Sequence, residues 1–188
     1  DASSTISEGE ILQLSAVRNI KTDESAYFKI IEGKTAALFA AATEVGAVIS
    51  NVEDKEADAL ANFGKALGIS FQITDDLLDY VGSDEVLGKN IGDDFKEGKV
   101  TLPLIKAISK SSKEEKRFWE EVINKGMQKS SDLEHALLLM QQHNVFEETR
   151  SEAIKWSKKA RNYLDIFPES KTKVILQELT YFVVERIT

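Results

Sequence analysis

The sequence predicts an all-α protein that folds as a single helical bundle. Apolar residues recur at helical spacing along most of the 188 residues, and strand-like alternation is nowhere sustained. Only two prolines, Pro103 and Pro168, interrupt the pattern. Because 42% of the residues are hydrophobic, the chain can bury a core of its own. We therefore predict one domain over residues 1–188.

The first half of the chain is predicted to begin with two helices. The first covers Ile6–Asn19 and is expected to bury three apolar side chains, Ile11, Leu12 and Leu14. Asp23 is expected to cap a longer helix over Glu24–Ile49. The middle of that helix is rich in alanine and other apolar residues, which favours burial against close neighbours.

A third long helix and a charged loop are predicted next. Asn51 is expected to cap the helix, which continues to about Tyr80. Four of the ten glycines then fall between Gly82 and Gly98, among acids and lysines, which is typical of a mobile loop. Pro103 is expected in the first turn of the following helix, where proline is tolerated. Further amphipathic helices are predicted at Lys113–Lys125, Asp132–His143, Glu147–Phe167 and Lys171–Ile187.

The composition excludes several classes of function. The net charge of −8 disfavours nucleic acid as a partner, because phosphate backbones are bound by surplus Lys and Arg. The absence of cysteine excludes disulfides, thiolate metal sites and cysteine nucleophiles. No apolar run is long enough to span a bilayer and no signal-peptide pattern is present, so a cytoplasmic location is expected.

An acidic cluster is the most unusual feature of the sequence. On a helix, Asp75, Asp76 and Asp79 are spaced so that their carboxylates share one face. A fixed group of carboxylate oxygens is what a hard divalent cation such as Mg²⁺ prefers. The alternative is a solvated acidic face without a ligand.

Lysines near this cluster could hold an anion. Lys89 and Lys99 lie in the glycine-rich loop that follows the aspartates, where they could neutralise phosphate oxygens. An ordinary helix connector with solvated charges would look similar. Lys34, followed by Thr35, lies in an apolar helix, so its ammonium group either extends to solvent or holds an anion.

These stretches, in this order, resemble the trans-isoprenyl diphosphate synthases, also called polyprenyl synthetases, and most closely the octaprenyl and decaprenyl diphosphate synthases. The matching stretches are Gly9–Leu14, Lys34–Phe39, Phe71–Tyr80 and Leu87–Leu104. The resemblance implies an isoprenoid-synthase-type helical bundle around a central cavity, usually in a homodimer. It also implies a Mg²⁺-dependent transferase that joins an allylic diphosphate to isopentenyl diphosphate, with a product of C40–C50.

The resemblance also assigns roles to individual residues. It implies that Mg²⁺ is held by three carboxylates, Asp75, Asp76 and Asp79. It implies that the allylic diphosphate is held by three lysines, Lys34, Lys89 and Lys99. The groups implied to act in catalysis are Lys34, Thr35 and Gln72, and the side chains of Thr35 and Gln72 are implied to lie against the developing allylic cation. A long prenyl product is nearly insoluble, so transient membrane contact through the product is compatible with this function.

The sequence departs from the family in one respect, because the first Asp-rich motif and the isopentenyl diphosphate site have no counterpart here. We therefore expect the 188 residues to be the C-terminal part of a synthase lacking the N-terminal helices, and to be inactive alone. Three alternatives remain: a non-catalytic subunit of a heteromeric synthase, a shorter-chain geranylgeranyl or farnesyl synthase, and an acidic helical interaction domain without a metal.

Overall fold

The structure, a computed structural model, describes residues 2–82 and 91–187 and has helices as its only regular elements within those ranges. The predicted all-α class is therefore confirmed. None of the helices in the described part of the chain has the length and apolar character needed to cross a bilayer.

The first 49 residues form two helical rods, the second of them interrupted by a π-helical segment. The elements are α1 (Ala2–Ala16), α2 (Glu24–Ile31), η1 (Glu32–Ala36) and α3 (Ala37–Ile49). The predicted cap is confirmed, because the Asp23 side chain accepts a hydrogen bond from the backbone nitrogen of Ala26 at 2.8 Å. The predicted helix over Glu24–Ile49 is present, but the widened turn of η1 was not foreseen.

The helix α4 (Asp54–Val81) lies at the centre of the bundle and begins at a different cap from the one predicted. Its N-cap is Glu53, whose backbone nitrogen donates to the Glu56 side chain at 3.2 Å. Asn51 instead adopts a left-handed conformation, with φ of 48°, in the turn after α3. Asparagine tolerates that conformation better than most residues, so it serves the turn here rather than the helix.

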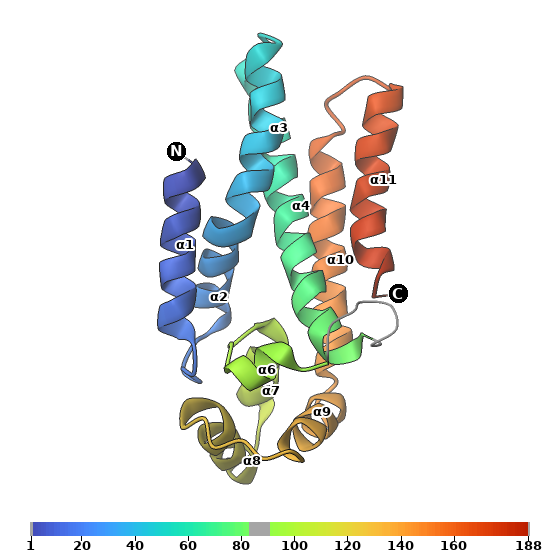
Figure 1. Cartoon of the computed structure of the whole chain (residues 1–188). Coiled ribbons are helices and arrows are strands. Elements are labelled where there is room, and N and C mark those ends of the chain that lie inside the picture. Colours follow the sequence, from blue (N-terminus) through green and yellow to red (C-terminus); the bar gives the residue numbers. More distant parts are fainter. Residues whose placement is uncertain (1, 83–90, 188) are drawn as a thin grey trace.

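Two long helices, α10 and α11, and several short ones follow α4 in the described part of the chain. They are α6 (Asp93–Glu97), α7 (Leu102–Lys110), α8 (Lys113–Trp119), the π-helical η2 (Glu120–Asn124), α9 (Asp132–Gln142), α10 (Val145–Tyr163) and α11 (Lys171–Glu185). Pro103 lies in the first turn of α7, as predicted. Figure 1 shows α1, α3, α4, α10 and α11 running side by side, with α6 to α9 gathered at one end.

The core surrounds α4, which packs against α3 on one side and α10 on the other. From Phe63 to Tyr80 most of its side chains are buried. Gly64 permits close packing, since a Cβ there would lie 2.4 Å from the carbonyl oxygen of Phe39 on α3. The half of α4 that carries the aspartates is largely buried as well.

The apolar side of α1 is exposed, which contradicts the sequence prediction. The exposed fractions of Ile11, Leu12 and Leu14 are 66%, 47% and 72%. The helix touches the bundle through the opposite side, where Gly9 is its buried residue. The predicted burial of these three side chains is therefore wrong, because the described part of the chain supplies nothing to cover them.

Candidate functional site

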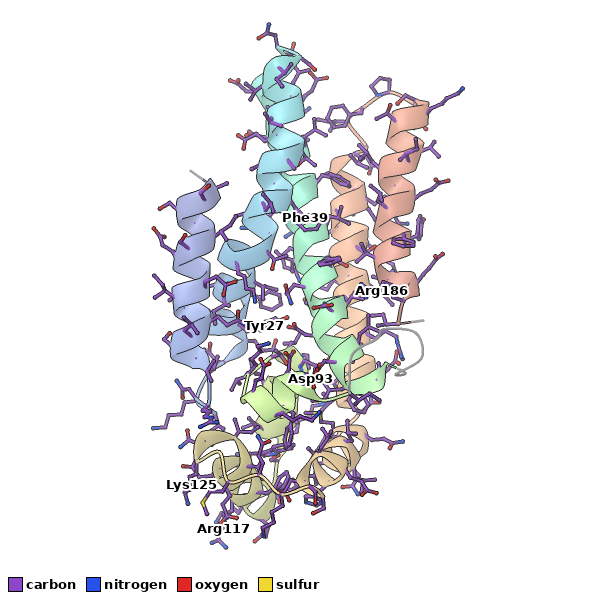
Figure 2. All side chains as sticks on the ribbon, viewed as in Figure 1. Tyr27, Phe39, Asp93, Arg117, Lys125 and Arg186 are labelled. Atoms are coloured by element: carbon purple, nitrogen blue, oxygen red, sulfur yellow. The ribbon has the colours of Figure 1, made fainter. Side chains whose placement is uncertain are left out.

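Four of the predicted site residues line a small pocket between α1, α2, η1 and α4, whereas Thr35, Asp75 and Asp79 are not among its lining residues. The volume of this pocket is about 20 Å³, which leaves room for little more than a water molecule. The residues that line it include Gln13, Tyr27, Lys34, Gln72, Asp76 and Lys99. Figure 2 shows Tyr27 on α2, and Asp93 at the start of α6.

The π-helical turn of η1 carries Lys34 and Thr35 into this region. Lys34 Nζ donates to Gln13 Oε1 at 2.6 Å and lies 3.7 Å from the carboxylate of Glu10. Its side chain is 28% exposed, so its ammonium group is held by α1 instead of extending freely to solvent. The Thr35 hydroxyl donates to Gln72 Oε1 at 2.7 Å, so two residues predicted to act together are in contact.

Asp76 is the most buried of the three predicted carboxylates. Its Oδ2 accepts a hydrogen bond from the Tyr27 hydroxyl at 2.6 Å, and its Oδ1 accepts one from Gln72 Nε2 at 2.8 Å. Burial raises the pKa of Asp76 to about 7, and the negative charges of Asp94 and Asp75 add to the effect. The two hydrogen bonds act in the opposite direction but do not compensate for the burial.

Asp79 and Asp75 lie in different surroundings. Asp79 Oδ2 accepts a hydrogen bond from the backbone nitrogen of Asp94 at 3.0 Å. Burial, followed by the negative charge of Asp94, raises the pKa of Asp79 to about 6. Asp75 is partly buried and makes no hydrogen bond or ion pair with any residue that the structure describes. Its carboxylate is therefore available to a ligand.

The donor set fits a hard divalent cation. The carboxylates of Asp75, Asp76 and Asp79 are hard oxygen donors, and the negative charge of Asp94 adds to the burial that raises the pKa values of Asp76 and Asp79. Within residues 2–82 and 91–187, no three His, Cys, Asp or Glu side chains are grouped closely enough to hold a metal ion by themselves. Mg²⁺ commonly takes only one or two protein carboxylates and completes its shell with water and phosphate oxygens.

Lys99 lies at the edge of the same pocket. Its ammonium group pairs with Asp94 at 3.0 Å and with Glu97 at 2.7 Å. Burial lowers the pKa of Lys99, but these hydrogen bonds outweigh it and leave the pKa above the usual range. Lys99 therefore stays cationic, as a diphosphate ligand must. Lys89, the other lysine predicted in this loop, lies outside the described residues.

Sequence reasoning missed three residues that help to build the site. Tyr27 contacts Asp76, Gln13 contacts Lys34, and Asp94 contacts both Asp79 and Lys99. The sequence held one signal for Tyr27. It precedes Lys34 by seven residues, which is about two helical turns, so a continuous helix places both residues on the same face. The partners of Gln13 and Asp94 lie on other elements, where sequence spacing gives no information.

Comparison with known proteins gives the family. The family model described as "Polyprenyl synthetase" matches residues 1–140. The chain belongs to the polyprenyl synthetase family. An octaprenyl diphosphate synthase from Haemophilus influenzae is 35% identical over 186 residues, which cover 99% of this chain and 56% of that protein. The chain thus spans little more than half the length of the curated relatives that it matches.

Solved structures of the family share the fold. A decaprenyl diphosphate synthase from Rhodobacter capsulatus superposes with a TM-score of 0.95 at 49% identity, covering 100% of this chain and 57% of that one. A polyprenyl synthase from Caulobacter crescentus, solved with calcium and isoprenyl diphosphate, gives a TM-score of 0.94 at 42% identity and covers 57% of that chain. The helical fold that the resemblance implied is therefore confirmed.

Proposed function

We propose that the protein to which these residues belong is a Mg²⁺-dependent prenyltransferase. It joins an allylic diphosphate to isopentenyl diphosphate, releases pyrophosphate and makes a long all-trans polyprenyl diphosphate, of C40–C50. The observation that carries the proposal is the pocket itself, where Lys34 and Lys99 lie with Gln72 and Asp76 in a polyprenyl synthetase. The relatives named octaprenyl and decaprenyl synthase support the product length.

The chain's own residues supply three parts of the chemistry. The ammonium groups of Lys34 and Lys99 would hold the diphosphate as the allylic carbon–oxygen bond breaks and the electron pair leaves with pyrophosphate. Mg²⁺, held through Asp75, Asp76 and Asp79, would neutralise the negative charge of the pyrophosphate leaving group. The oxygens of Thr35 and Gln72 would face the developing cation until the double bond of isopentenyl diphosphate attacks and a proton is lost.

Two further points belong to the same proposal. No part of the chain matches the family's first Asp-rich motif or its isopentenyl diphosphate site, so the 188 residues alone should not turn over. The second substrate would then bind to residues outside this sequence. A homodimer is proposed on the resemblance to the family, as is the transient contact of the product with membranes.

The test is an elongation assay on the full natural protein that contains these residues. With Mg²⁺, an allylic diphosphate and labelled isopentenyl diphosphate, we expect polyprenyl diphosphates whose length is read by chromatography. Asp75→Asn should lower kcat by about a hundredfold or more, whereas Asp58→Asn, an exposed change on the same helix, should not change it. If the natural protein alone makes no product but makes product when a second polypeptide is added, the alternative of a non-catalytic subunit in a heteromeric synthase is favoured instead.

A further inference from the structure

A buried tyrosine from α2 contacts the carboxylate cluster of α4. The Tyr27 hydroxyl donates to Asp76 Oδ2 at 2.6 Å, across 49 positions of sequence. Both side chains are almost fully buried, with exposed fractions of 3% for Tyr27 and 5% for Asp76. A short hydrogen bond to a carboxylate in such surroundings is strong and directional.

The other oxygen of Asp76 is held from a second direction. Gln72 Nε2 donates to Asp76 Oδ1 at 2.8 Å, and the Thr35 hydroxyl in turn donates to Gln72 Oε1 at 2.7 Å. Three elements, α2, η1 and α4, thus determine the rotamer of one carboxylate. Each carboxylate oxygen can accept two hydrogen bonds, and each oxygen of Asp76 accepts one from a described side chain.

The hydroxyl of Tyr27 does more than packing requires. The ring packs edge-on against Phe28, with ring centroids 5.5 Å apart, and lies in the main core cluster. Phenylalanine would satisfy those contacts equally well and would not place a hydroxyl in the core. The hydroxyl is therefore explained by its one polar partner, Asp76.

We propose that Tyr27 is a positioning residue for the metal site, whose hydroxyl fixes the Asp76 carboxylate in the orientation that accepts a divalent cation. The proposal rests on the proposed function, because it needs Asp76 to be a cation ligand. Groups that orient a ligand in this way commonly change metal affinity by about tenfold to a hundredfold when they are removed. Tyr27 itself need not touch the metal or the substrate.

The test compares two Tyr→Phe variants of the full natural protein. Tyr27→Phe removes the hydroxyl that contacts Asp76. Tyr163→Phe removes the hydroxyl of a partly buried tyrosine on α10, which makes no hydrogen bond with a described residue. The readout is the rise in melting temperature caused by pyrophosphate as Mg²⁺ is titrated. We expect Tyr27→Phe to need an Mg²⁺ concentration about tenfold higher than the wild type to reach half of the maximal rise in melting temperature. Tyr163→Phe should need the same concentration as the wild type.

The outcomes separate this inference from the proposed function. A Mg²⁺ requirement of Tyr27→Phe within about twofold of the wild type would overturn the positioning role alone, since a change of that size is far below what loss of an orienting group produces. A wild-type protein that pyrophosphate and Mg²⁺ do not stabilise would overturn the role together with the proposed function.

A double variant tests whether Tyr27 acts through Asp76. Asp76→Asn removes the charge that Tyr27 solvates, so Asp76→Asn and Tyr27→Phe/Asp76→Asn are compared with each other. If Tyr27 acts through the Asp76 carboxylate, the two have the same Mg²⁺ requirement. A further several-fold rise in the double variant would show that Tyr27 acts by another route and would overturn the proposal.

Discussion

Gly9 on α1 lies directly against the backbone of Lys34 in η1. A Cβ at Gly9 would stand 2.3 Å from the Lys34 nitrogen and 2.7 Å from the carbonyl carbon of Gly33. This close approach of the two backbones lets Gln13, one turn further along α1, reach the Lys34 ammonium group at 2.6 Å. A residue without a side chain thus determines where the proposed diphosphate-binding lysine is held.

Replacing Gly9 by alanine should therefore destabilise the protein. The added methyl group forces α1 away from η1, and we expect the free energy of unfolding to fall by about 1–3 kcal/mol. Gly46→Ala is the control, because its Cβ would meet nothing within 4 Å and alanine favours the helix by about 0.5–1 kcal/mol. Urea denaturation measures the stability of both variants. Equal midpoints for Gly9→Ala and Gly46→Ala would contradict the expected clash.

Ser111 should stabilise the end of α7 through a buried indole. Its hydroxyl accepts from Trp119 Nε1 at 2.8 Å and donates to the Ala107 carbonyl oxygen at 2.7 Å. Since Trp119 is fully buried, Ser111→Ala leaves the indole N–H without a partner and should cost about 1–3 kcal/mol. Ser109→Ala, which removes an exposed hydroxyl from the same helix, should change stability by less than about 0.5 kcal/mol in the same denaturation experiment.

Stability should depend on pH through Glu115. Hydrogen bonding from the backbone nitrogen of Ser112, at 2.6 Å, and then from His143, at 3.0 Å, lowers the pKa of Glu115 below its ordinary 4.5. The native state therefore binds this proton less readily than the unfolded state does. Its contribution to stability is complete above pH 4.5 and is lost as the pH falls through the lowered native pKa.

The check on Glu115 is thermal denaturation as a function of pH. Glu115→Gln should be less stable than the wild type at neutral pH, and the difference should shrink as the pH falls below 4.5. Glu114→Gln is the control, because Glu114 is exposed and makes no hydrogen bond or ion pair with a described residue. A difference between Glu115→Gln and the wild type that stays constant with pH would refute the assignment.

Lys99 should contribute to the binding of diphosphate. Lys99→Gln removes an ammonium group from the edge of the pocket, and we expect pyrophosphate to bind about tenfold or more weakly in the presence of Mg²⁺. Lys96→Gln removes a lysine of the same segment that is half exposed and pairs with Asp93, so it should bind like the wild type. Calorimetric titration with pyrophosphate compares them, and equal affinities would exclude Lys99 from the site.

Short-range patterns in the sequence determined much of this protein. The helical spacing of apolar residues, the Asp23 cap and the position of Pro103 depend on residues within one or two turns, and all three predictions are confirmed. The order of the motifs identified the family for the same reason, since it is a property of the linear chain. The roles assigned to the aspartates and lysines stay predictions.

Other features were decided only by the tertiary structure. The contact of Tyr27 with Asp76 and that of Gln13 with Lys34 each join different helices, and the choice of Glu53 over Asn51 as a cap follows from the path of the turn. No local spacing encodes such contacts, because they exist only once the helices have packed. The raised pKa of Asp76 has the same origin, since burial by the surrounding helices is its main cause.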